Sequence, residues 1–278
     1  MEKKRVLLAL AVMVVGVYGS NAIAITPMGP PRATLQEGET LFGLEFEHSE
    51  MDLKAFGTIK TLEQGAPSWE SDFRKYKIEN LKSNMIMGRL SAGLSENWDF
   101  FLRLGVTDAQ ADITAINSDD TDGDKFKDFD GSHGLAWGIG TRATFYQEGD
   151  TTWGGIIQIT WANPGESDIS IDNDPTFSGD AEIKYWEVQV AVGPTIELDT
   201  FRFYAGPFLH FVTGDLDIKG QTPGVSQFDK SDIEIREESQ FGGYAGAQWY
   251  LGENSSLFTE FQFTSDAWGV GVGTFWKF

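Results

Sequence analysis

From residue 40 to the last residue, apolar and polar side chains alternate with a period of two, and no stretch of this region is a continuous apolar run. Phe42, Leu44 and Phe46, for example, are separated by a glycine and a glutamate. Side chains of a β-strand point to opposite faces in turn, whereas an amphipathic helix repeats its apolar residues at i, i+3 and i+4. The pattern therefore predicts an all-β chain whose strands have one apolar and one polar face.

The alternation divides into ten segments, near 40–47, 86–94, 98–106, 133–146, 151–161, 183–194, 201–212, 240–251, 257–264 and 268–278. Tight turns alternate with long polar connections near 55–74, 115–131, 163–181 and 214–239, and the last connection, 265–267, is short. Short turns at one end and long loops at the other are typical of barrels that cross an outer membrane. We therefore predict a transmembrane up-and-down antiparallel β-barrel of about ten strands, with eight as the alternative, and with both termini in the periplasm.

Aromatic residues on the outward parity support a membrane barrel over a soluble β-sandwich. They recur eight residues apart in five segments, at 137 and 145, 153 and 161, 203 and 211, 241 and 249, and 268 and 276. Eight residues of a strand tilted by about 40° rise roughly 20 Å, close to the height of the apolar band of such barrels. The spacing predicts two aromatic girdles.

The first 24 residues have the features of a signal peptide. Three basic residues at positions 3–5 precede an apolar run from Val6 to Gly19, and residues 22–24 form a small-x-small cleavage site. The run is shorter than the roughly 20 residues that a membrane-spanning helix requires. We expect cleavage after Ala24 and export of the remaining chain. Residues 25–39 contain three prolines without periodicity, which predicts an extended periplasmic leader, followed by a barrel over 40–278.

Composition excludes several classes of function. The chain has 42 acidic and 21 basic residues, a net charge of −21, and no cysteine. Nucleic acid is excluded as a partner because phosphate binding needs a basic surface. Disulfides, thiolate metal sites and cysteine nucleophiles are excluded as well.

The chain ends in a glycine, two residues, and then aromatic-x-aromatic with phenylalanine last, over residues 273–278. This ending is similar to the terminal signal that the barrel assembly machinery recognises. Together with the strand pattern, it resembles bacterial outer-membrane β-barrel proteins, the superfamily of the outer membrane protein A transmembrane domain and small porin-like barrels. The resemblance implies an integral outer-membrane location in a Gram-negative-type envelope, with lipid and the assembly machinery as partners, and Gly273, Trp276 and Phe278 as the assembly signal. It leaves the oligomeric state open.

The inward parity carries a mixture of cations, anions and hydrogen-bonding groups. We expect the lumen to be lined by Glu45, Glu47, Arg89, Arg103, Arg142, Gln158, Glu187, Gln189, Arg202, Tyr204, His210 and Glu260. Because charges taken out of water must be paired, the balance predicts a salt-bridged polar core that fills a narrow barrel. A charged constriction that selects solutes is the alternative.

One predicted loop concentrates carboxylates around a glycine. Asp120, Asp122, Asp124 and Asp128 have the oxygen chemistry of a Ca²⁺ site, although the closing glutamate of an EF-hand is absent. A solvated acidic surface is the other interpretation, and no further cofactor is expected.

These features predict a structural or surface-interaction barrel with a narrow salt-bridged lumen and acidic extracellular loops. The alternative is a narrow porin-like channel that prefers cations. We do not expect an enzyme, because His210 is the one histidine on the inward parity. Catalysis would need a carboxylate or serine within hydrogen-bond reach of that side chain.

Overall fold

The structure, a computed structural model, describes residues 25–117, 120–172, 174–224, 226–229, 233–237 and 240–278. The expected signal peptide, residues 1–24, lies outside the described residues. The strands are β1 (Thr40–Glu63), β2 (Glu70–Ser95), β3 (Trp98–Ile116), β4 (Asp122–Glu148), β5 (Thr151–Asn163), β6 (Glu166–Ile171), β7 (Asp174–Glu197), β8 (Phe201–Thr222), β9 (Ser226–Asp229), β10 (Ile233–Arg236), β11 (Phe241–Tyr250), β12 (Ser255–Phe263) and β13 (Ala267–Lys277). Among the described residues, no helix is long and apolar enough to cross a membrane.

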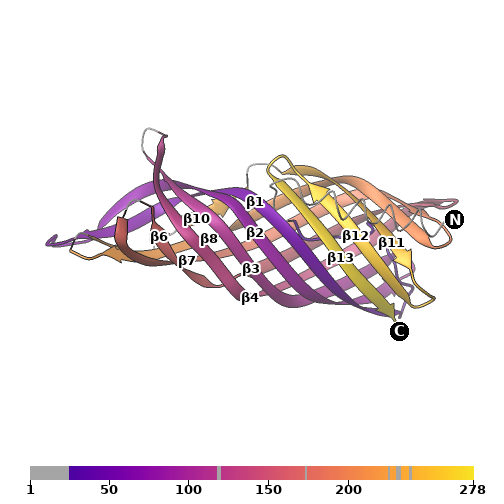
Figure 1. Ribbon diagram of the computed structural model, residues 1–278. Coiled ribbons are helices and arrows are strands. Elements are labelled where there is room, and N and C mark those ends of the chain that lie inside the picture. Colours follow the sequence, from indigo (N-terminus) through magenta and orange to yellow (C-terminus); the bar gives the residue numbers. More distant parts are fainter. Residues whose placement is uncertain (1–24, 118–119, 173, 225, 230–232, 238–239) are drawn as a thin grey trace, which may run out of the picture.

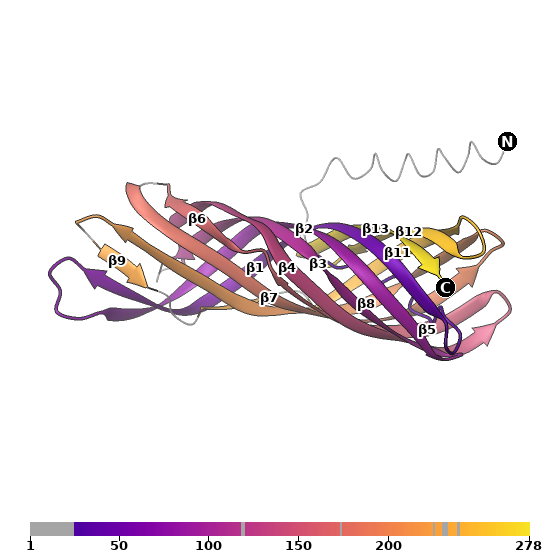
Figure 2. The same ribbon diagram turned by 90° about the horizontal axis from the view of Figure 1, so that it is seen from below.

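Ten of these strands form a closed antiparallel ring (Figures 1 and 2). The order is β1-β2-β3-β4-β5-β7-β8-β11-β12-β13, and β13 returns to β1 from the Leu41–Lys277 pair to the Met51–Ala267 pair. Closure leaves no strand edge with unpaired backbone groups facing lipid. The prediction of an all-β up-and-down barrel with ten strands is confirmed. We call this part of the barrel, residues 40–51, 82–95, 98–107, 134–163, 185–212 and 241–277, the ten-strand section.

Farther from the C-terminus the described part of the ring narrows to eight strands. There β6 takes the place of β5 between β4 and β7, and β10 takes the place of β11, β12 and β13 between β8 and β1. We call this part, residues 53–63, 70–78, 109–116, 122–131, 166–184 and 213–236 as far as they are described, the eight-strand section. β6 and β10 lie toward this end in Figure 1, opposite the C-terminus.

The prediction of long loops near 55–74, 115–131, 163–181 and 214–239 is wrong, because most of their described residues continue the barrel as strands. The pairing register shifts where the two parts of the wall meet, at Glu79/Lys82 of β2, opposite Thr107/Ala109 of β3 and between Met51 and Leu53 of β1. In β2 the extra residue moves the following side chains to the other face, so the buried positions change from even-numbered, at Tyr76 and Ile78, to odd-numbered, at Leu81 and Ser83. This change of phase hides the continuation of β2.

The outer surfaces of the two sections differ in polarity. Exposed large apolar side chains cover the ten-strand section, among them Leu44, Ile86, Leu104, Ile157 and Val272. The outer face of the eight-strand section is mostly charged, with exposed side chains that include Lys54, Lys60, Lys75, Asp112 and Lys125. Apolar side chains favour lipid and charged ones favour water. The ten-strand section is therefore the membrane-spanning part, and the eight-strand section projects beyond it.

The aromatic residues of the expected girdles lie on the outer wall of the ten-strand section. Seven of them are exposed, namely Phe145, Trp153, Phe203, Phe211, Phe241, Trp249 and Trp276. Trp268 differs, since it is 8% exposed and its ring packs against Phe261 and His48.

The interior also changes between the sections. Apolar side chains fill the eight-strand section, including Leu53, Ile78, Ile113, Phe126 and Leu216, none of them more than 4% exposed. Burial among them raises the pKa of the Tyr76 hydroxyl to about 12. In the ten-strand section, by contrast, the buried side chains on the wall include many charged and amide-bearing ones, such as Glu45, Arg89 and Gln158.

A pair of arginine substitutions tests where the membrane ends. Ile157, 49% exposed on β5, and Phe73, 62% exposed on β2, are both outward apolar residues, one in each section. Ile157→Arg should cost about 2 to 4 kcal/mol because it places a cation in lipid, whereas Phe73→Arg should cost less than about 0.5 kcal/mol. Urea unfolding in lipid vesicles measures both. Equal losses would place both residues in the same medium and contradict this division.

Candidate functional site

The leader lies inside the barrel, which corrects the prediction that residues 25–39 are periplasmic. Ile25, Met28 and Leu35 are at most 3% exposed within the ten-strand section. Wall glycines make room for the chain: a Cβ atom on Gly271 would lie 2.5 Å from the Cβ of Pro27. The prolines lack the amide hydrogens that a sheet requires, so the leader does not join the wall as a strand. It forms a plug, residues 25–37.

Two wall carboxylates hold the plug by its backbone. Glu187 on β7 accepts hydrogen bonds from the Thr26 amide, at 3.0 Å, and from the Thr26 hydroxyl. Glu260 on β12 accepts from the amides of Met28 and Gly29, at 2.7 and 2.8 Å. An ionised acceptor strengthens these bonds, and the bonds satisfy amide groups that would otherwise be buried without partners.

Side chains of the barrel wall also donate hydrogen bonds to the carbonyl groups of the plug. The side chains of Gln158 and Gln262 donate to the Thr26 carbonyl at 3.1 and 3.0 Å. Arg103 donates to the Pro27 carbonyl at 3.2 Å, and Arg142 donates to the Met28 carbonyl at 2.9 Å. The polar lumen is therefore matched to an extended peptide that carries both donors and acceptors.

Every residue expected to line the lumen is buried on the inner wall of this section, where each is at most 5% exposed. The pairing differs from a simple set of four salt bridges. Arg89 pairs with Glu45 at 3.0 Å, and Arg103 approaches the same carboxylate at 3.7 Å. Arg202 pairs at 2.7 Å with Glu197, to which the leader residue Arg32 also bonds. The charged side chains of the lumen therefore bond partly to one another, as arginine–glutamate pairs, and partly to the plug.

The remaining lumen residues extend the hydrogen-bond network. Gln189 links the side chains of Gln158 and Gln262 across the wall. Tyr204 stacks obliquely on Tyr244, with ring centroids 6.3 Å apart. The amide contacts join β5, β7 and β12 through one polar lining.

His210 lies between two carboxylates at the inner end of the plug. Its Nε2 atom is 2.9 Å from Glu187 and its Nδ1 atom is 2.7 Å from Glu237. Carboxylates therefore lie within reach, as catalysis would require. However, both ring nitrogens already have partners, so neither is free to take a proton from a nucleophile. The arrangement ties β7, β8 and the segment before β11 together.

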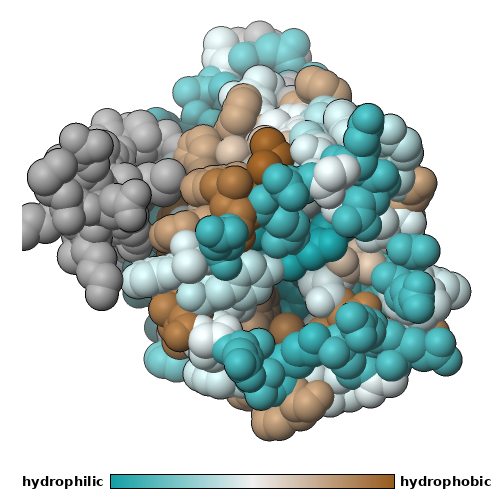
Figure 3. Space-filling view, turned by 90° about the vertical axis from the view of Figure 1, so that its right-hand side faces the viewer, coloured by the Kyte–Doolittle hydropathy of each residue, from teal (hydrophilic) through white to brown (hydrophobic). Residues whose placement is uncertain are grey.

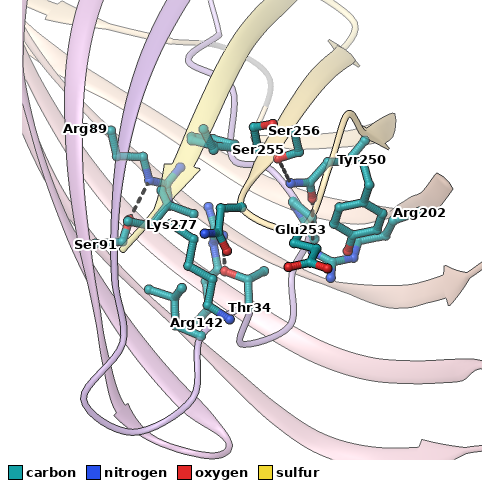
Figure 4. A pocket seen from close by; sticks show the side chains of 16 residues that line it. Thr34, Arg89, Ser91, Arg142, Arg202, Tyr250, Glu253, Ser255, Ser256 and Lys277 are labelled. Carbon is teal, nitrogen blue, oxygen red and sulfur yellow. Dashed lines mark hydrogen bonds between the residues drawn. The ribbon is translucent and has the colours of Figure 1, made fainter. Parts of the chain in front are cut away.

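The open mouth of the lumen is at the end that carries the C-terminus. Figure 3 looks onto this end, where hydrophilic side chains surround a hollow. A cavity of about 170 Å³ there is lined in part by Arg89, Arg142, Arg202, Tyr250 and Lys277 (Figure 4). At its edge Lys277 pairs with Glu39 at 2.5 Å, and this hydrogen bond holds the pKa of the Glu39 carboxyl below its usual range. The plug closes the cavity on its inner side.

The residues considered for calcium are only partly described. Asp120 accepts a hydrogen bond from Lys75 at 2.9 Å, and Asp122 accepts one from Lys77 at 3.0 Å. Asp124 is exposed, and the side chain of Asp128 lies outside the described part. Within that part, no three metal-binding side chains gather into a site.

The sequence patterns did not predict two further residues of the lumen. One of them nevertheless lies at an inward position of the alternation. Asp99 is 1% exposed, shares the inward parity of β3, and accepts from the Thr34 amide at 2.6 Å. Glu237 follows β10 in a segment without alternation, so no pattern marks it. The residues that contact the plug do not recur at a fixed spacing, so no sequence pattern marks these contacts.

Comparison with known proteins finds distant structural similarity but no related sequence family. No family model and no curated protein matches the chain. Solved structures that match include the outer membrane protein OprG from Pseudomonas aeruginosa, with 11% identity, TM-score 0.44, and coverage of 87% of this chain and 97% of that one. The outer membrane protease OmpT from Escherichia coli has 9% identity, TM-score 0.48, and coverage of 91% and 99%. Ail of Yersinia pestis has 12% identity, TM-score 0.28, and coverage of 87% and 100%.

The fold is a membrane-spanning β-barrel. Its closed ring and lipid-facing apolar wall are the features that such barrels share. Identities this low carry no activity from one barrel to another. At the terminus, Trp276 stacks on Phe42 with centroids 6.2 Å apart, and the Phe278 amide bonds to the Thr40 carbonyl at 3.0 Å.

Replacing one carboxylate tests how the plug is held. In Glu260→Gln the acceptor for Met28 and Gly29 loses its charge, which should cost about 1 to 3 kcal/mol of plug binding. Hydrogen exchange at those two amides should then become roughly tenfold faster or more. Glu253→Gln, an exposed glutamate in the β11–β12 turn, is the control and should leave the exchange unchanged. Unaltered exchange in Glu260→Gln would show that this contact does not hold the plug.

Proposed function

We propose that this protein is an integral outer-membrane barrel with a closed lumen and a structural or surface-interaction role, without transport or catalysis. The observation that carries the proposal is the double obstruction of the interior. Residues 25–37 occupy the ten-strand section, and apolar side chains occupy the eight-strand section beyond it.

Each obstruction opposes ion flow for a different reason. In the ten-strand section, wall groups that would replace the water of a passing ion already bond to the plug. In the eight-strand section, residues such as Ile78 and Ile218 offer an ion no ligand at all. An ion would have to cross both regions.

The proposed orientation follows from the export signal and the barrel pattern. We place the termini and the arginine-lined mouth in the periplasm, after removal of residues 1–24. The charged eight-strand section then stands outside the cell, and its strands present a rigid surface rather than mobile loops. Membrane lipid and the barrel assembly machinery, which would recognise Gly273, Trp276 and Phe278, are the proposed partners. Calcium binding by the Asp120–Asp128 region would add to that outer surface.

A narrow cation-preferring channel is the second candidate. The surplus of acidic residues in the whole chain favours cations at its outer end. This candidate requires the plug to leave and the apolar section to become wet.

Conductance in planar bilayers separates the two candidates. We expect purified protein to show no steady open level, and we expect the same of a variant lacking residues 25–37, because the apolar section stays closed. The heat-modifiable mobility of both proteins on gels controls for correct folding. A steady open level in the unaltered protein would refute the closed barrel. Current in the deletion variant but not in the unaltered protein would show that the plug, and not the apolar section, blocks ion flow.

A further inference from the structure

One lumen carboxylate differs from its neighbours in having no bonded partner in the described structure. Glu47 on β1 is 2% exposed, and its Oε1 atom is buried without a hydrogen bond. Glu45, Glu187 and Glu260 each bond to an arginine, a histidine or the plug. A buried carboxylate without a partner is costly, so the position points to a missing cation or donor.

The plug brings one particular backbone nitrogen to this part of the wall. The nitrogen of Ile25 lies 3.0 Å from where a Cβ atom of Gly269 would stand. Gly269 pairs with Ser49 across the β1–β13 ladder, and Gly271 pairs with Glu47. Side chains two residues apart on a strand share a face, so Glu47 and the Ile25 nitrogen are diagonal neighbours on the inner wall.

The charges around Glu47 favour a cation there. Its carboxylate interacts with Glu45 and Glu187, which repel it, and with Arg103, which attracts it. Arg103 already bonds to the Pro27 carbonyl and to Thr160. Glu187 also holds Thr26, the residue next to Ile25. A positive charge on the Ile25 nitrogen would therefore lie between two carboxylates.

We propose that cleavage of the signal peptide creates the cation that Glu47 binds. Hydrolysis of the Ala24–Ile25 peptide bond consumes one water molecule and leaves a carboxylate on Ala24 and an amine on Ile25. The amine takes up a proton at neutral pH and becomes an ammonium group. This ammonium forms a buried ion pair with Glu47 and fixes the end of the plug in the lumen.

The ion pair makes closure of the lumen depend on processing. Before cleavage the Ile25 nitrogen is a neutral amide with one hydrogen, and Glu47 lacks its cation. After cleavage three N–H donors and a full charge are available. The inference rests on the proposed removal of residues 1–24 but not on the absence of conductance.

The test compares two chemical forms of the N-terminus. Mass spectrometry first establishes that the protein isolated from outer membranes begins at Ile25. The unfolded protein is then acetylated near pH 6.5, where the α-amine reacts before the lysines, and is refolded into vesicles. We expect acetylation to speed urea unfolding of the unaltered protein by tenfold or more, and of Glu47→Gln by less than twofold.

Glu50→Gln is the matched control. Glu50 is a neighbouring glutamate on β1, 4% exposed, that faces Lys82 at 3.9 Å and not the plug. This variant should keep the full effect of acetylation. An equal effect of acetylation in the unaltered protein and Glu47→Gln would overturn the inference, as would a mature N-terminus at another residue.

A measurement on the unaltered protein keeps the inference testable if Glu47→Gln fails to fold. An amine-reactive ester should label the Ile25 α-amine at least a hundredfold more slowly in the folded barrel than in urea. Equal rates would mean that the ammonium is free in water and not bound to Glu47. Steady conductance, by contrast, would refute the closed-barrel function and leave this ion pair standing.

Discussion

The structure depends on the rule that backbone polar groups must be satisfied wherever water is absent. The wall meets this rule by closing ten strands into a ring. The plug cannot pair as a strand, so it meets the rule through side chains: Glu187 and Glu260 accept from its amides, while Gln158 and Arg142 donate to its carbonyls. The buried charges of the lumen thus have a structural reason to be there.

The change from ten strands to eight explains why the two interiors differ. The interior of a ten-strand ring is too wide for the side chains of its wall to fill. It therefore has room for an extended peptide, which the polar side chains of the wall surround. An eight-strand ring is narrow enough for side chains to fill, and here they are apolar, as Tyr76 and Phe126 illustrate with ring centroids 6.5 Å apart. The bulges near Asn80 and His133, whose φ angles are 52° and 65°, lie at the level of this transition.

The sequence patterns predicted the membrane-spanning barrel, but they predicted neither the plug inside it nor the eight-strand section. Alternation is a local property, so it gave the ten membrane strands and the inward side of residues such as Arg142 and Glu260. It did not give the plug, because an extended peptide held by long-range hydrogen bonds needs no periodicity; Met28 and Glu260 are 232 residues apart. It also missed the eight-strand section, since polar outward side chains and bulges together look like loop sequence.

A cysteine pair tests most directly whether residues 25–37 lie in the lumen of the folded protein. The chain has no cysteine, and a Cβ atom at 271 would lie 2.5 Å from that of residue 27, about 1 Å closer than in a disulfide. Pro27→Cys combined with Gly271→Cys should cross-link fully on mild oxidation. Pro27→Cys combined with Gly88→Cys on the outer wall should not. Free thiols in the first pair, with the cysteine at position 27 open to a membrane-impermeant maleimide, would place the leader outside the barrel and contradict the account.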